Sequence, residues 1–237
     1  MDVALIGLAA SGKTTLLKAL AAGHLPHHPS PNEPAVAVVK VPDERLDRLA
    51  ALVSARKTTH LELRLLDFPS LSAGRKGPPP QLLGVLSTAD LIVHVVRAYG
   101  ESDVDPARDI AALDMELVLA DLGIVDRRIE RLSIESRSLP AGARGAQEWE
   151  RALLRRLKEA LEAEKPVRSL GLTADEKALL AGFNLITAKP LLIVLNIDEA
   201  DAARTEQIEA EARARYAGAE TGLIALAAKA EADVAEL

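Results

Sequence analysis

The chain has 237 residues, 49% of them hydrophobic, which suffices for one large domain or for a core domain carrying an insertion. It has no cysteine, which excludes disulfides, thiolate metal sites and a cysteine nucleophile. With a net charge of −6, no signal peptide pattern and no apolar run of the roughly 18 residues that span a bilayer, we expect a cytoplasmic protein that enters no membrane and binds no DNA.

The first part of the chain predicts strands that alternate with helices. The apolar strands are typical of a parallel sheet that is buried on both faces. We interpret His94, inside the last of them, as a core histidine with a satisfied hydrogen bond. Strands are predicted at Val3–Ile6, Ala35–Val41, Leu61–Leu66 and Leu91–Val96, and helices at Lys13–Ala22, from Asp43 onward and at Gln81–Ala89.

The middle of the chain has a different pattern. Two long, charged, amphipathic stretches, Ala107–Ser136 and Ala146–Glu164, flank a proline- and glycine-containing turn and predict a coiled-coil-like helical hairpin. A strand at Leu191–Leu195, a helix at Asp201–Tyr216 and a strand at Gly222–Leu226 then complete the sheet. The prediction is an α/β domain with a mostly parallel sheet, formed by residues 1–105 and 185–237 and interrupted by a helical insertion at residues 106–184.

A glycine-rich segment lies between the first strand and the first helix. Residues 7–14, Gly-Leu-Ala-Ala-Ser-Gly-Lys-Thr, match the pattern G-x-x-x-x-G-K-[ST] at every fixed position. Glycines let backbone N–H groups face phosphate oxygens, the helix N-terminus favours the same anion, and the lysine reaches the β- and γ-phosphates. The segment predicts a loop that binds a nucleoside triphosphate. Its predicted binding residues are Gly7, Ala10, Ser11, Gly12, Lys13, Thr14 and Thr15.

Two residues are candidate ligands of a nucleotide-bound Mg²⁺ ion. Thr14 supplies the hydroxyl that this motif directs to the metal. Asp67 ends an apolar strand, the position from which an acidic residue orients Mg²⁺. A strand-terminal aspartate can also simply cap a turn, and the neighbouring loop is what favours the metal role.

The residues after the strand Leu191–Leu195 bear on the choice of base. GTPases of this class carry Asn-Lys-x-Asp here, whereas this chain has Asn196, Ile197, Asp198 and Glu199. A guanine-reading carboxylate accepts from two donors that adenine lacks, while an asparagine can pair with the adenine 6-amino group and N7. The sequence therefore favours ATP or ADP over GTP.

These motifs, together with five other stretches, resemble the YchF/Ola subfamily of Obg-related P-loop proteins. The stretches are Val41–Asp47, Ile92–Arg97, Glu116–Leu122, Leu185–Pro190 and Ala228-Lys229. The resemblance implies a Ras-like domain interrupted by an antiparallel coiled coil, a preference for ATP, and a base bordered by the backbone of Ile197 and Ala228. The charges of the hairpin are most simply a solvated helical face, and the resemblance adds a ribosome or RNA contact through the coiled coil as an alternative. Members of the subfamily continue into a TGS domain, which we expect this chain either to lack or to have lost by truncation.

The chain departs from the subfamily around the γ-phosphate. Ser70 stands where a glycine is expected, and Pro31 stands where a magnesium-binding threonine is expected, with Ser30 beside it. Leu71 occupies the position of the water-orienting glutamine of classical GTPases, a hydrophobic replacement that is typical of the subfamily. The short loop Ala98–Asp105 lacks the histidine that the subfamily carries. We therefore expect retained nucleotide binding, impaired hydrolysis and no assignable catalytic residue.

Three functional hypotheses remain. The first is a slow magnesium-dependent ATPase that acts as a nucleotide-dependent switch. The second is a scaffold that keeps ATP or ADP as a structural ligand and presents its coiled coil to a protein partner. The third is a true GTPase, which Ile197 and Glu199 disfavour.

Overall fold

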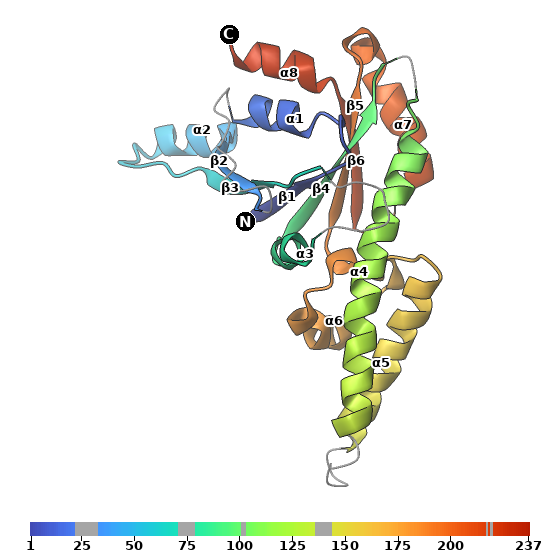
Figure 1. The fold of residues 1–237 in the computed structure, drawn as a ribbon. Coiled ribbons are helices and arrows are strands. Elements are labelled where there is room, and N and C mark those ends of the chain that lie inside the picture. The colour runs from blue at the N-terminus through green and yellow to red at the C-terminus, as the bar shows by residue number, and fades with distance from the viewer. Residues whose placement is uncertain (22–32, 71–78, 101–102, 136–143, 217, 219) are drawn as a thin grey trace.

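A six-stranded sheet lies at the centre of the computed structural model, which describes all residues except 22–32, 71–78, 101–102, 136–143, 217 and 219 (Figure 1). The strand order is β2-β3-β1-β4-β5-β6, and only the β2–β3 pair is antiparallel. The predicted α/β class with a mostly parallel sheet is confirmed. The strands are β1 (Asp2–Ile6), β2 (Ala35–Val41), β3 (Leu61–Asp67), β4 (Leu91–Ala98), β5 (Leu191–Ile197) and β6 (Thr221–Leu226).

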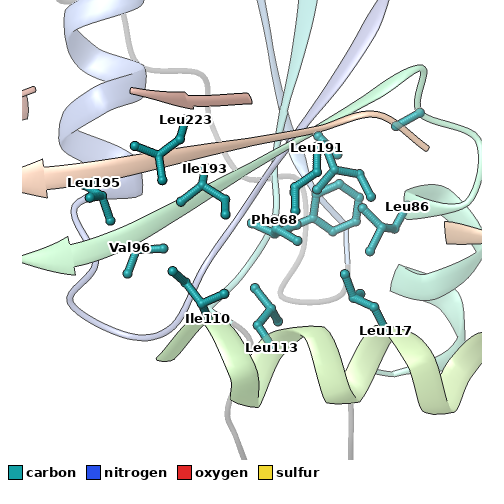
Figure 2. Packing of buried hydrophobic residues seen from close by; sticks show 14 of the residues in the cluster. Phe68, Leu86, Val96, Ile110, Leu113, Leu117, Leu191, Ile193, Leu195 and Leu223 are labelled. Atoms are coloured by element: carbon teal, nitrogen blue, oxygen red, sulfur yellow. The ribbon is translucent and has the colours of Figure 1, made fainter. Parts of the chain in front are cut away.

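Helices cover both faces of the sheet, as its apolar strands require. On one face, Leu16 and Leu17 of α1 (Lys13–Leu20) and Ala228 of α8 (Ala228–Ala235) pack against the strands. The other face is covered by α3 (Pro80–Leu86), α7 (Thr205–Tyr216) and the beginning of α4 (Pro106–Glu135). Figure 2 shows Ile110, Leu113 and Leu117 of α4 directed toward the sheet, with Ile110 nearest to Val96 and Leu117 nearest to Leu86 of α3.

Helix α4 extends well beyond the sheet, because its 30 residues span about 45 Å. Its second half packs against α5 (Arg144–Glu162), and the two helices project together from one end of the molecule (Figure 1). Val125, Leu154 and Leu157 are fully buried between them. None of the helices in the described ranges is long and apolar enough to cross a membrane.

A buried polar network joins the middle of α4 to two short 3-10 helices, η2 (Val167–Leu170) and η4 (Ile186–Ala188). The carboxylate of Asp121 accepts hydrogen bonds from the Ile186 and Thr187 backbone N–H groups, at 2.9 and 2.7 Å, and from the Thr187 hydroxyl at 2.7 Å. The same hydroxyl accepts from the backbone N–H of Val167 at 3.1 Å. These bonds attach α4 to the segment that leads into β5.

Several elements differ from the sequence-based prediction. The predicted helix at Asp201–Tyr216 is divided into a 3-10 helix, η5 (Glu199–Arg204), and α7. The helix α6 (Ala174–Leu180), which begins with a capping box formed by Thr173 and Glu176, was not predicted. The amphipathic α2 (Glu44–Leu52) forms as expected, but none of its residues is buried.

Candidate nucleotide-binding site

The predicted phosphate-binding loop connects β1 to α1 at the edge of the sheet where the parallel strands end. Gly12 is the N-cap of α1 and adopts φ 90°, a left-handed conformation that favours glycine. A Cβ atom at Gly12 would overlap the side-chain amide of Asn196, and one at Gly7 would overlap the carbonyl oxygen of Val95. Both glycines are therefore required by the close approach of the loop to β4 and β5.

Lys13 points back across this loop and is almost fully buried, with 6% of its surface exposed. Its ammonium group donates hydrogen bonds to the Gly7 carbonyl at 3.2 Å and to the Ser70 hydroxyl at 3.3 Å. Burial lowers the pKa of Lys13, and the nearby charge of Asp67 opposes that shift. The Ser70 hydroxyl, whose contact with Lys13 was not expected from the sequence, thus competes for the group that would bind phosphate.

The two candidate magnesium ligands both lie near Lys13, Thr14 as the next residue and Asp67 at the end of β3. Asp67 ends β3 and is buried, within electrostatic reach of Lys13, whereas Thr14 is exposed in the first turn of α1. Within the described ranges, no three histidine, cysteine or acidic residues form a cluster that could hold a metal ion. A hydroxyl and one carboxylate fit an ion that takes its remaining ligands from phosphate and water, as Mg²⁺ does at nucleotide sites.

Asn196 connects the loop to α8, a contact that the sequence did not reveal. Its side-chain amide donates to the Ser11 carbonyl at 3.0 Å, and its amide oxygen accepts from the Ala228 N–H at 2.9 Å. A primary amide has a second N–H and a second lone pair. The bonds of Asn196 to Ser11 and Ala228 therefore leave one N–H and one lone pair for adenine. The pairing of Asn196 with adenine stays a prediction.

A cavity of about 350 Å³ adjoins the loop, within the size range of ligand sites. Among the predicted residues, Thr15, Asn196, Ile197 and Glu199 line it, and Ala228 lies beside it through its bond to Asn196. Tyr99, Asp198, Ala227 and Lys229 also line the cavity and were not predicted as binding residues. Tyr99 carried a detectable signal, because it is an aromatic residue at the carboxyl end of a parallel strand, where ligands bind in open α/β sheets.

Several residues of the predicted switches, Ser30, Pro31 and Leu71, lie outside the described residues. The loop Ala98–Asp105 is described except at residues 101–102. The expectations about these switches therefore stay predictions.

Comparison with known proteins identifies the family. No family model matches the chain. The ribosome-binding ATPase YchF of Bacillus subtilis is 34% identical, and the match covers 100% of this chain and 68% of that protein. The chain belongs to the YchF family. The YchF protein of Haemophilus ducreyi, which bears the same name, is 31% identical over 98% of this chain and 66% of its own length.

A solved structure supports the same assignment. The structure of the Schizosaccharomyces pombe YchF GTPase matches all of this chain and 68% of that protein, with a TM-score of 0.81 and 26% identity. The resemblance inferred from the motifs is thus confirmed. The chain spans about two thirds of the length of these YchF proteins, which are named ATPases in the two bacteria and a GTPase in the yeast.

Proposed function

We propose that this YchF family member binds ATP with Mg²⁺ at the loop of residues 7–14, hydrolyses it slowly, and acts as a nucleotide-dependent switch that associates with the ribosome. The observation that carries the proposal is the loop itself. It places a buried lysine, an uncapped helix N-terminus and a buried hydroxyl around one position, next to a cavity large enough for a base.

Phosphate recognition is supported by three features of the loop. The first turn of α1 has no side-chain cap among the described residues, so its N–H groups can meet an anion. Lys13 brings a buried positive charge to the same place. The Ser11 hydroxyl is buried without a hydrogen-bond partner in the described part of the chain, and a phosphate oxygen would satisfy it.

The choice of ATP over GTP is supported by two residues that line the cavity, Ile197 and Glu199. Ile197, at the position of the lysine in the GTPase pattern, is apolar and buried, with its side chain in the core cluster. Glu199 is exposed at the rim in the position of the guanine-reading aspartate. The curated relatives in Bacillus subtilis and Haemophilus ducreyi are both named ATPases.

The proposal of slow hydrolysis is supported by the contact between Lys13 and Ser70. Phosphoryl transfer depends on positioning and on charge neutralisation at the γ-phosphate. Ser70 holds the Lys13 ammonium with a hydroxyl at 3.3 Å and places a side chain where close backbone approach was expected. We assign no catalytic residue among the described side chains.

Ribosome association is supported by the names of the relatives and by the projecting α4–α5 pair, which offers a long surface away from the sheet (Figure 1). A switch requires that the affinity for the ribosome differ between the ATP-bound and the ADP-bound protein. Pelleting of the protein with ribosomes in the presence of ATP and of ADP tests the point. Equal binding under both conditions would argue against a switch.

The decisive test of the nucleotide site is a titration of ATP, ADP and GTP, with and without Mg²⁺, into the wild type and a Lys13→Ala variant. Loss of a buried charged hydrogen-bond donor should weaken ATP binding by about 10- to 100-fold. Lys18→Ala is the matched control, because Lys18 lies on the same helix but is partly exposed and paired with Glu236. Unchanged ATP binding by Lys13→Ala would refute the site.

The same titration separates the alternative functions. Tight ATP binding with phosphate release at a slow rate supports the proposal. Tight binding with no phosphate release would instead favour the scaffold that keeps its nucleotide as a structural ligand. Tighter binding of GTP than of ATP would overturn the assignment of the base.

A further inference from the structure

Tyr99 connects the end of β4 to the phosphate-binding loop. Its hydroxyl donates a hydrogen bond of 2.7 Å to the carbonyl oxygen of Ala10. The tyrosine is itself held in place by Arg97, whose guanidinium lies 5.3 Å from the ring centre and whose Nε donates to the Tyr99 carbonyl at 3.1 Å. The hydroxyl is therefore presented to the loop by a fixed side chain.

Ala10 is the residue of the loop that most needs such support. Its φ is 60°, in the left-handed region that residues with a Cβ atom rarely adopt. The next carbonyl along the chain, that of Ser11, accepts from Asn196 at 3.0 Å. Two successive carbonyl groups of the loop are thus fixed by side chains from the ends of two neighbouring strands, β4 and β5.

Fixing these carbonyl groups also fixes the N–H groups of the loop. In a trans peptide unit the C=O and N–H bonds point in opposite directions. With the Ala10 carbonyl directed at Tyr99, the N–H of Ser11 turns toward the inside of the loop, where it donates to the Leu8 carbonyl at 3.3 Å. The Tyr99 hydroxyl therefore fixes the orientation of the Ala10–Ser11 peptide unit, and with it the turn of the loop that leads into α1.

Tyr99 also contributes to the cavity next to the loop. It lines the cavity that also contains Asn196, Ile197 and Glu199, the residues that follow β5. We propose that Tyr99 is a positioning residue for the nucleotide: its hydroxyl holds the phosphate-binding loop in its binding conformation, and its ring forms a wall of the base pocket. The inference rests on the proposed function, because it assumes that a nucleotide occupies this site.

The hydroxyl is tested with Tyr99→Phe, which keeps the ring. Affinities for Mg·ADP and for Mg·pyrophosphate are measured by calorimetry, and hydrogen exchange of the loop amides is measured without ligand. Loss of one neutral hydrogen bond should weaken both ligands by the same factor, about three- to ten-fold, and accelerate exchange at residues 10–13 but not in β4. Tyr216→Phe is the matched control, because that tyrosine lies on α7 and outside the loop and its cavity.

The ring is tested with Tyr99→Leu. Relative to Tyr99→Phe, this variant should lose about a further three- to ten-fold in affinity for Mg·ADP and nothing for Mg·pyrophosphate, which has no base. Circular dichroism of each unliganded variant verifies that it is folded. If Tyr99→Leu does not fold but Tyr99→Phe does, the hydroxyl is still tested by Tyr99→Phe.

The outcomes distinguish this inference from the proposed function. If the wild type binds neither ligand, the proposed function fails. If the wild type binds ADP, Lys13→Ala does not, and Tyr99→Phe equals the wild type with both ligands, the inference is overturned while the function stands. If Tyr99→Phe weakens ADP but not pyrophosphate, the hydroxyl acts on the base and its role in the loop is refuted.

Discussion

Single buried polar side chains define the phosphate-binding loop. Lys13, Ser11 and Asn196 are each at least 94% buried, and each has a polar group that an apolar interior would disfavour. Lys13 bonds to the loop and to Ser70, and Asn196 bonds to the loop and to α8. The Ser11 hydroxyl has no hydrogen-bond partner within the described ranges. An anionic ligand would stabilise the lysine and satisfy the serine together, which is why we expect the loop to bind one.

His94 gives a prediction about pH. It is buried in β4 as expected, but its Nε2 atom has no hydrogen-bond partner in the described part of the chain, contrary to the interpretation of a satisfied core histidine. Burial, with the charges of Lys13 and Arg168 nearby, lowers the pKa of His94 to about 3. The unfolded chain then binds a proton below about pH 6.5 while the folded protein does not, so stability falls as the pH decreases from that value toward 3.

The test compares the wild type with His94→Leu in urea unfolding at pH 7, 6 and 5. Between pH 7 and pH 5 the wild type should lose about 2 kcal/mol more of its unfolding free energy than the variant, because only the wild type takes up this proton on unfolding. The comparison removes the contribution of the carboxylates, which both proteins share. Identical pH dependence would show that His94 is accessible to protons in the folded state.

At the scale of elements, Asp121 bonds the middle of α4 to η4, in the segment that leads into β5. Burial raises the pKa of Asp121, and its bonds from Thr187 and Ile186 counteract that shift. Asp121→Asn replaces one acceptor oxygen with a donor that faces other donors. We expect a loss of about 1–3 kcal/mol in unfolding free energy, measured by chemical denaturation.

Asp126→Asn is the matched control for Asp121→Asn. Asp126 lies on the same helix, but its 2.7 Å pair with Lys158 is partly exposed to solvent, so its loss should cost at most about 1 kcal/mol. An equal effect of the two substitutions would mean that the buried network contributes no more than a surface ion pair.

The sequence predicted the features that depend on residues close together in the chain. Every strand in the described ranges was located, because each is an apolar run or, at Leu61–Leu66, an alternation of apolar and polar residues. The loop of residues 7–14 was located because its motif is local in the sequence. The Asp121 network was not predicted, because its partners Ile186 and Thr187 lie 65 and 66 residues away. The bond from Tyr99 to Ala10 spans 89 residues and was missed for the same reason.

Amphipathic patterns also indicated more burial than the structure shows. In α2, the spacing of Leu46, Leu49 and Leu52 in the sequence predicts an apolar face, yet Leu49 and Leu52 are 56% and 83% exposed. A hydrophobic period predicts that a helix has an apolar face. It does not say whether a neighbouring element covers that face, which depends on where the topology places the helix.

At the scale of the whole molecule, α4 belongs to two hydrophobic clusters. Ile110, Leu113 and Leu117 pack in the cluster beneath the sheet, while Val118 and Val125 belong to the cluster around α5. Because one continuous helix supplies residues to both, loss of the outer packing must also destabilise the helix that covers the sheet. The predicted boundary at residue 106 would separate two parts by sequence, and we propose that they nevertheless unfold together.

Leu157→Ala tests this cooperativity. Leu157 on α5 is fully buried against α4, and truncating it should lower the unfolding free energy by about 2–5 kcal/mol. Urea unfolding is followed by the fluorescence of Trp149, the single tryptophan, which lies on α5, and by far-ultraviolet circular dichroism, which reports on all elements. If the molecule is one cooperative unit, both transitions shift to lower urea together, whereas Leu119→Ala, at an exposed position of α4, moves them by no more than about 0.5 kcal/mol. A shift of the Trp149 transition alone would show that the projecting helices unfold independently of the sheet.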